Sequence, residues 1–199
     1  MRAPIISVIM PVRNMEEFIF SSIESICKQS LNDFELIIID DASEDQTAHI
    51  IKELNDPRII IINNEKHIGN YKCRNQGLAK ARGKYICVMD ADDLADSSRL
   101  LKQYTFMETN PYFVAAGSDS ILFSENSSSN ILKRLRDEHQ LKVHLLKDNV
   151  CTHPTLIIRK DIMKKYKVAY NDNYYYSADY DLLVQLSQIG AITNMPETL

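Results

Sequence analysis

The sequence predicts an α/β fold with a mostly parallel central sheet flanked by helices, and three observations support this. Four short apolar runs rich in β-branched residues alternate with helical patterns through the first half of the chain. The runs are apolar throughout, which is typical of parallel strands that are covered on both faces. Polar side chains directly follow three of the runs, and ligands of such sheets bind at the carboxyl ends of strands.

The first half supplies four strands and the helices between them. The apolar runs predict strands, at 5–10, 34–39, 59–62 and 85–89. Asn14 can cap a first helix, and the capping-box pattern at 43–46 predicts a second helix that runs to about Leu54. A third helix is predicted over 70–82, with Gly83 at its C′ position. This alternation of strands and helices predicts parallel pairing.

The second half is less regular. Apolar runs predict short strands, at 113–116, 121–123 and 156–158. Helices are expected after 96–98, from 137–140 onward, and over 179–189, where Gly190 ends the last one. The Ser/Asn-rich segment 125–130 is expected to be a polar loop tip.

Composition limits the classes of function. The 199 residues suffice for a sizeable core and no linker divides them, so we expect one domain over 1–199. A net charge of −4 argues against nucleic acid as a partner, because binding phosphates needs a basic surface. The four cysteines lack metal-ligand spacing, which favours reduced thiols. With neither a transmembrane run nor a signal peptide, we expect a cytoplasmic protein and leave peripheral contact with the inner face of the membrane open.

The segment 90–93 carries three acids, including a DxD pattern, directly after the fourth predicted strand. Mg²⁺ and Mn²⁺ prefer carboxylates, usually one or two of them together with phosphate oxygens. Acids at this place could instead cap the next helix, but Asp96 and Ser97 are better placed for that role. We therefore favour a metal site at 90–93.

Two further segments offer groups for a phosphorylated ligand. Asp40 or Asp41 could accept a hydrogen bond from a base or a ribose, or both could be spare beside a cap at Ser43. Lys72 and Arg74 lie at the start of a predicted helix, where two cations and a helix N-terminus suit a diphosphate. The alternative for both cations is solvated surface charge.

In their order, these segments resemble the motifs of family 2 glycosyltransferases with the GT-A fold. The resemblance is carried by six segments: 7–16 (SVIMPVRNME), 40–45 (DDASED), 69–77 (GNYKCRNQG), 81–93 (ARGKYICVMDADD), 153–155 (HPT) and 179–182 (DYDL). Each segment alone is unspecific, but together they span nearly the whole chain. The resemblance implies a Rossmann-like GT-A domain, with a nucleotide-sugar-binding half at 1–95 and an acceptor-binding half at 96–199.

The resemblance also implies the reaction and the residues that serve it. An inverting enzyme would move a sugar from a nucleotide-diphosphate donor, a UDP-sugar, to a hydroxyl of a carbohydrate or lipid-linked glycan in surface polysaccharide synthesis. Asp179 would be the general base and Asp92 would bind Mn²⁺ or Mg²⁺. The implied nucleotide-sugar-binding residues are Pro11, Arg13, Asn14, Asp41, Lys72, Arg74, Asp90 and Ala91. Within this set, Asp41 would contact the edge of the uracil ring.

Three departures from the family pattern define an alternative. Arg13 replaces the family's Tyr, Ala178 replaces the acid before the base, and the chain ends where many relatives continue, so we expect a C-terminal truncation. The alternative is a catalytically weak donor-binding or scaffold domain. A haloacid-dehalogenase-type phosphatase is disfavoured because its DxD motif follows the first strand, whereas the DxD here follows the fourth. A dehydrogenase is disfavoured because no GxGxxG motif follows the first strand. Four histidines are expected to be surface or helix residues: His49, His67, His139 and His144.

Overall fold

A central sheet with the strand order β3-β2-β1-β4-β7-β5-β6 organises the molecule, and β8 pairs with β5. The computed structural model describes residues 2–124 and 127–199. The strands are β1 (Ile6–Val12), β2 (Phe34–Asp40), β3 (Ile59–Asn63), β4 (Tyr85–Val88), β5 (Phe113–Ser124), β6 (Ser127–Leu132), β7 (Ile157–Arg159) and β8 (Ala191–Thr198). The helices are α1 (Ile19–Cys27), α2 (Thr47–Glu53), α3 (Asn70–Lys80), α4 (Arg99–Thr109), α5 (Glu138–His144), the 3₁₀ helix η1 (His153–Thr155), α6 (Lys160–Tyr166) and α7 (Ala178–Ile189).

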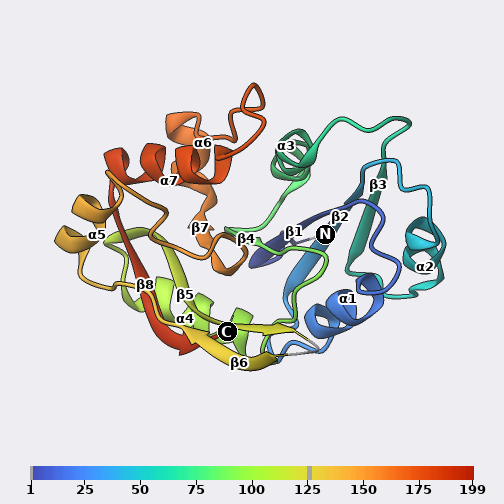
Figure 1. Ribbon diagram of the computed structural model, residues 1–199, viewed down its shortest axis with the longest axis horizontal. Coiled ribbons are helices and arrows are strands. Elements are labelled where there is room, and N and C mark those ends of the chain that lie inside the picture. The colour runs from blue at the N-terminus through green and yellow to red at the C-terminus, as the bar shows by residue number, and fades with distance from the viewer. Residues whose placement is uncertain (1, 125–126) are drawn as a thin grey trace.

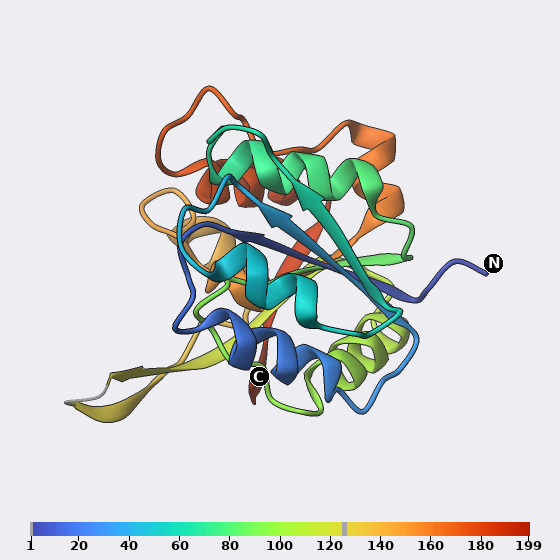
Figure 2. The same ribbon diagram turned by 90° about the vertical axis from the view of Figure 1, so that its right-hand side faces the viewer.

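The sheet is parallel where the sequence predicted it to be. Strands β1 to β4 pair in parallel, whereas β7 runs antiparallel to both β4 and β5. Helices α1, α2 and α4 lie on one side of the sheet, and α3, α6 and α7 lie on the other (Figure 1). Figure 2 shows β1, β2 and β3 passing between α3 and the pair α1 and α2. The predicted α/β sheet flanked by helices is thus confirmed.

Two apolar cores lie on the two faces of the sheet. Alternate side chains of β2 enter opposite cores: Ile37 belongs to the core that also contains residues of α3 and α7, while Leu36 and Ile38 belong to the core that contains residues of α1 and α4. All seven residues of β2 are buried. The carboxyl ends of β1, β2 and β4 therefore meet at one edge of a rigid sheet, which positions the loops that follow them.

The first strand runs longer than predicted, through Pro11 to Val12. The backbone N–H and C=O groups of the odd-numbered residues in β1 point toward β4. The hydrogen bond from the Met89 N–H to the Ile9 carbonyl, at 3.1 Å, shows this orientation. Strand β4 ends at Val88, opposite Ile9. An N–H at position 11 would point past the end of β4, where no residue of that strand could accept it. Proline lacks only this donor, so it is tolerated here.

The first two helices begin later than predicted, because their expected caps bind elsewhere. Asn14 adopts a φ of +53°, and its Oδ1 accepts the Glu44 N–H at 2.8 Å instead of capping α1. The hydroxyl of Ser43 donates to Asp40 Oδ1 at 2.5 Å instead of capping α2, and Asp45 Oδ1 accepts the N–H of Thr47, the first residue of α2, at 2.9 Å. Asn14 and Ser43 thus brace the loops at the sheet edge. The interpretation of Asp40 and Asp41 as spare acids beside a Ser43 cap is therefore wrong.

Gly83 is needed for a close approach rather than for the C′ position of α3, which ends at Lys80. The Gly83 N–H donates to Ser7 Oγ at 2.8 Å, and a Cβ on Gly83 would lie 2.5 Å from the Ser7 nitrogen. Because that neighbour is backbone of β1, the clash could be relieved only by separating the α3–β4 connection from the sheet.

Replacing Gly83 with Ala is therefore expected to lower the free energy of unfolding by about 2 kcal/mol, as overpacked sites do. The measurement is the urea midpoint, with the exposed Lys80→Ala as the matched control. A Gly83→Ala midpoint equal to that of the wild type would contradict this account of the turn.

The second half contains a β-hairpin that the sequence did not predict. One strand, β5, covers both predicted strands at 113–116 and 121–123. Residues 127–130 of the expected loop tip belong to β6, which pairs antiparallel with β5, and residues 125 and 126 lie outside the described residues. Helix α5 follows Asp137 as predicted, and the carboxylate of Asp137 accepts the Gln140 N–H.

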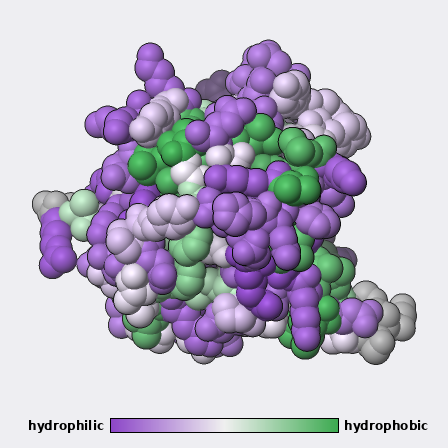
Figure 3. Space-filling view, turned by 90° about the vertical axis from the view of Figure 1, so that its left-hand side faces the viewer, coloured by the Kyte–Doolittle hydropathy of each residue, from purple (hydrophilic) through white to green (hydrophobic). Residues whose placement is uncertain are grey.

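The surface gives one further observation. Within residues 2–124 and 127–199, no helix combines the length and the apolar character needed to cross a membrane. The side of the molecule that carries α5 and α7 is mainly hydrophilic, with hydrophobic residues gathered in a band across its upper half (Figure 3).

Candidate active site

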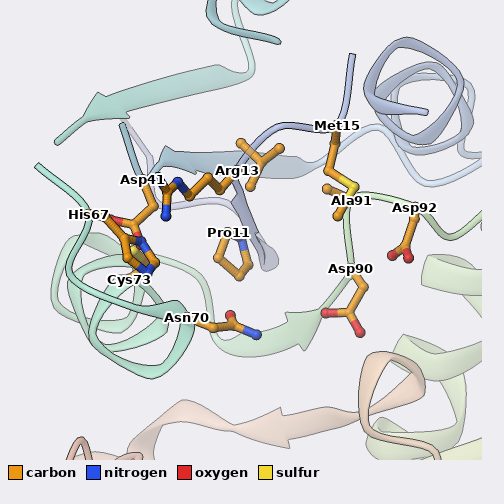
Figure 4. A pocket seen from close by; sticks show the side chains of 11 residues that line it. Pro11, Arg13, Met15, Asp41, His67, Asn70, Cys73, Asp90, Ala91 and Asp92 are labelled. Atoms are coloured by element: carbon orange, nitrogen blue, oxygen red, sulfur yellow. The ribbon is translucent and has the colours of Figure 1, made fainter. Parts of the chain in front are cut away.

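The loops after β1, β2 and β4, together with the start of α3, enclose a cavity of about 330 Å³. It is lined by Pro11, Val12, Arg13, Met15, Asp41, His67, Asn70, Cys73, Asp90, Ala91 and Asp92. Figure 4 shows Asp41 and His67 on one side of Pro11, and Asp90 and Asp92 on the other. A second cavity of about 600 Å³ shares Asp90 and Asp92 with the first. The volumes are typical of small-molecule sites.

Asp41 is buried in the wall of the first cavity and accepts four hydrogen bonds. Its Oδ1 accepts from Asn64 Nδ2 at 3.2 Å and from the Ile68 N–H at 2.9 Å. Its Oδ2 contacts His67 Nδ1 at 2.7 Å and accepts the Gly69 N–H at 2.8 Å. Burial raises the pKa of Asp41, but the hydrogen bonds from Ile68 and Gly69 outweigh it and leave the pKa below its ordinary value. Asp41 is therefore an ionised acceptor that holds the β3–α3 loop.

Arg13 lies on the same wall and connects two loops. Its Nη2 donates to Glu44 Oε1 at 3.0 Å, and its side chain is 33% exposed. The Nε of Arg13 is buried without a hydrogen-bond partner in the described part of the chain. The guanidinium plane therefore keeps a free donor beside the cavity.

Arg74 is buried and forms an ion pair with Asp90, which lines the cavity. Its guanidinium carbon lies 5.8 Å from the centroid of the Tyr170 ring. A buried cation needs a compensating partner, so Arg74 and Asp90 fix each other in place. The alternative of solvated surface charge is wrong for Arg74, whereas Lys72 is exposed.

Negative charge gathers beside the shared edge of the two cavities. Burial, followed by the charges of Asp90 and Asp92, raises the pKa of Asp93 to about 6. Among the residues that the structure describes, no group of three or more His, Cys, Asp or Glu side chains could hold a metal ion. Two carboxylates with room for phosphate oxygens nevertheless fit the ligand set of Mg²⁺ or Mn²⁺.

Helix α7 places Asp179 in its first turn, and Ser177 is the N-cap. The Tyr71 hydroxyl donates to Asp179 Oδ1 at 3.4 Å, and Asn149 Nδ2 donates to Oδ2 at 3.2 Å. Tyr71 also stacks on Tyr170, with ring centroids 5.9 Å apart. These contacts connect Asp179 to the stacked rings of Tyr71 and Tyr170.

The structure brings together most of the residues that the sequence singled out. Six of them line the first cavity: Pro11, Arg13, Asp41, Asp90, Ala91 and Asp92. Asn14, Lys72, Arg74 and Asp179 are outside its lining. His67 is exposed, as expected, and it also contacts Asp41 across 26 positions of sequence, a contact that no local spacing signals.

Comparison with known proteins decides the family. The model for glycosyl transferase family 2 matches residues 7–167. The chain belongs to this family. Two curated relatives are uncharacterized glycosyltransferases, from Haemophilus influenzae (33% identity, 98% of this chain, 64% of the relative) and Methanocaldococcus jannaschii (37% identity, 93% and 65%). The chain thus spans just under two thirds of these relatives.

Other similar proteins have more specific names. An Escherichia coli protein named as a UDP-Glc:α-D-GlcNAc-diphosphoundecaprenol β-1,3-glucosyltransferase is 37% identical over 55% of this chain and 43% of its own length. The fold matches Staphylococcus aureus TarS residues 1–349 in complex with UDP (TM-score 0.81, 20% identity, 98% of this chain, 58% of that 1–349 chain). It also matches a Pyrobaculum calidifontis mannosyltransferase in complex with GDP-Man and Mn²⁺ (TM-score 0.75, 15% identity, 98% and 56%). The GT-A fold expected from the motifs is confirmed.

Proposed function

We propose that the chain is the catalytic part of an inverting glycosyltransferase that uses a UDP-sugar with Mn²⁺ or Mg²⁺. One observation carries the proposal: a single cavity at the carboxyl ends of parallel strands has a wall at Pro11 and Asp41 and two carboxylates, Asp90 and Asp92, beyond it. Such a cavity suits a base at one end and a metal-bound diphosphate at the other.

The donor and the acceptor are proposed from relatives. UDP is supported by the TarS complex and by the UDP-Glc in the name of the Escherichia coli relative. That same name supports a lipid-linked glycan as acceptor. We assign donor binding to residues 1–95 and acceptor binding to 96–199, because the second cavity adds residues from β5 and η1 to the shared edge at Asp90 and Asp92.

The roles of individual side chains follow from their chemistry. Asp92 would hold the metal ion, and Asp90 beside it would contact the nucleotide sugar. When bound, this ion would offset the charge that develops on the leaving diphosphate. Asp90 is itself held by buried Arg74, so its carboxylate needs no reorganisation when the donor binds.

Asp179 would take the proton of the acceptor hydroxyl as the hydroxyl oxygen attacks the anomeric carbon. One displacement forms the new glycosidic bond, breaks the bond to the diphosphate and inverts the anomeric centre. Tyr71 and Asn149 would orient the carboxylate through the bonds they donate to its two oxygens.

The test is donor hydrolysis. We expect slow release of UDP from UDP-glucose or UDP-N-acetylglucosamine in Mn²⁺, and none after EDTA, as measured by a coupled UDP assay. Binding of UDP without release from either donor would contradict a transferase. It would instead favour the catalytically weak donor-binding domain.

A further inference from the structure

We propose that His67, rather than Asp41, reads the hydrogen-bonding edge of the nucleobase, and that it selects bases with an imino N–H, such as uracil. This inference rests on the proposed function, because it takes the first cavity as the place of the nucleotide. It names the residue that sets base preference in this chain, where the resemblance implies Asp41.

Asp41 has no free acceptor position for a base. An ionised carboxylate offers about four lone-pair sites, and four donors already occupy those of Asp41. Two of these donors are the backbone N–H groups of Ile68 and Gly69. A base that displaced them would leave these half-buried donors unpaired, at a cost in free energy.

The ring of His67, in contrast, keeps an acceptor that faces no other residue of the described chain. Its side chain is 52% exposed and lines the cavity, while its Nδ1 lies 2.7 Å from Asp41 Oδ2. Because an ionised carboxylate can only accept, the hydrogen in this bond belongs to Nδ1. In a neutral imidazole Nε2 is then an acceptor. No hydrogen bond to Nε2 occurs within residues 2–124 and 127–199, so this acceptor is available to a ligand.

An acceptor at His67 Nε2 matches the hydrogen-bonding edge of uracil. Uracil presents N3–H as a donor, whereas cytosine, a ring of nearly the same size, presents N3 as an acceptor. In a neutral His67 whose tautomer is fixed by Asp41, Nε2 would therefore accept the N3–H of uracil. With cytosine, the lone pair of Nε2 would face the lone pair of N3, and the two would repel each other. Asp41 acts here as a positioning residue that orients the ring (Figure 4).

The experiment compares UDP with CDP, because the two nucleotides differ at this edge alone. Affinities are measured by calorimetry in Mn²⁺ for the wild type, His67→Ala, His67→Gln and His49→Ala. His49 is the matched control, since it is exposed on α2 and pairs with Glu53 outside the cavity. His67→Gln can donate its amide N–H to Asp41 and keep an acceptor oxygen toward the base.

We expect the wild type to prefer UDP. His67→Ala should weaken UDP binding about tenfold and leave CDP binding within about twofold, so that the preference collapses, as loss of one hydrogen bond predicts. His67→Gln should restore part of the preference, and His49→Ala should match the wild type. An unchanged UDP-to-CDP ratio in His67→Ala would overturn the inference and leave the proposed function intact. A wild type that binds neither nucleotide would overturn both.

Discussion

Replacement of Asp179 with Asn is expected to reduce sugar transfer by a factor of about 10²–10⁴ and to leave the affinity for UDP within about twofold of the wild type. Asn keeps the shape of the side chain and can accept a bond from Tyr71 or Asn149, but it cannot take a proton. The measurement is the rate constant for donor turnover, with the Kd for UDP determined in parallel.

The neighbouring Asp181→Asn is the matched control. Asp181 lies in the same turn of α7, and its carboxylate accepts from Gln185 Nε2 at 2.6 Å, within the helix. We expect Asp181→Asn to keep its turnover rate. An Asp179→Asn variant that turned over at half the wild-type rate or more would contradict the assignment of the base.

Replacement of Asp92 with Ala should remove the metal-dependent part of UDP binding. We expect the Kd in Mn²⁺ to rise about tenfold or more, to the value that the wild type shows in EDTA, because the remaining carboxylate, Asp90, already pairs with Arg74. The exposed acid Glu17, outside both cavities, provides the control Glu17→Ala. Calorimetric titration of UDP in Mn²⁺ and in EDTA measures the effect, and a Mn²⁺-dependent affinity that survives in Asp92→Ala would contradict it.

Much of the fold could be predicted because apolar runs report burial directly. The strands that begin at Phe34 and Ile59 start where the sequence placed them, since every residue of such a run faces one of two cores. Helix starts were less predictable. Asn14 and Ser43 have the chemistry of caps, but their side chains bind the neighbouring loop, and that choice depends on tertiary contacts.

The cavity could be predicted in part for a similar reason. Acids after parallel strands must meet at one edge, so Asp41, Asp90 and Asp92 were expected to be neighbours, and they line one cavity. The pairing of Arg74 with Asp90 and of His67 with Asp41 could not be predicted. Both contacts depend on the course of the β3–α3 loop and on the rotation of α3, which residue spacing does not specify.

The central claim is that the first cavity binds a nucleoside diphosphate together with a divalent metal ion. Its most direct test is a calorimetric titration of UDP into the wild-type chain, with Mn²⁺ and again with EDTA. We predict a micromolar Kd in Mn²⁺ that weakens about tenfold in EDTA. Absence of heat from UDP, GDP and dTDP alike in the presence of Mn²⁺ would contradict the claim.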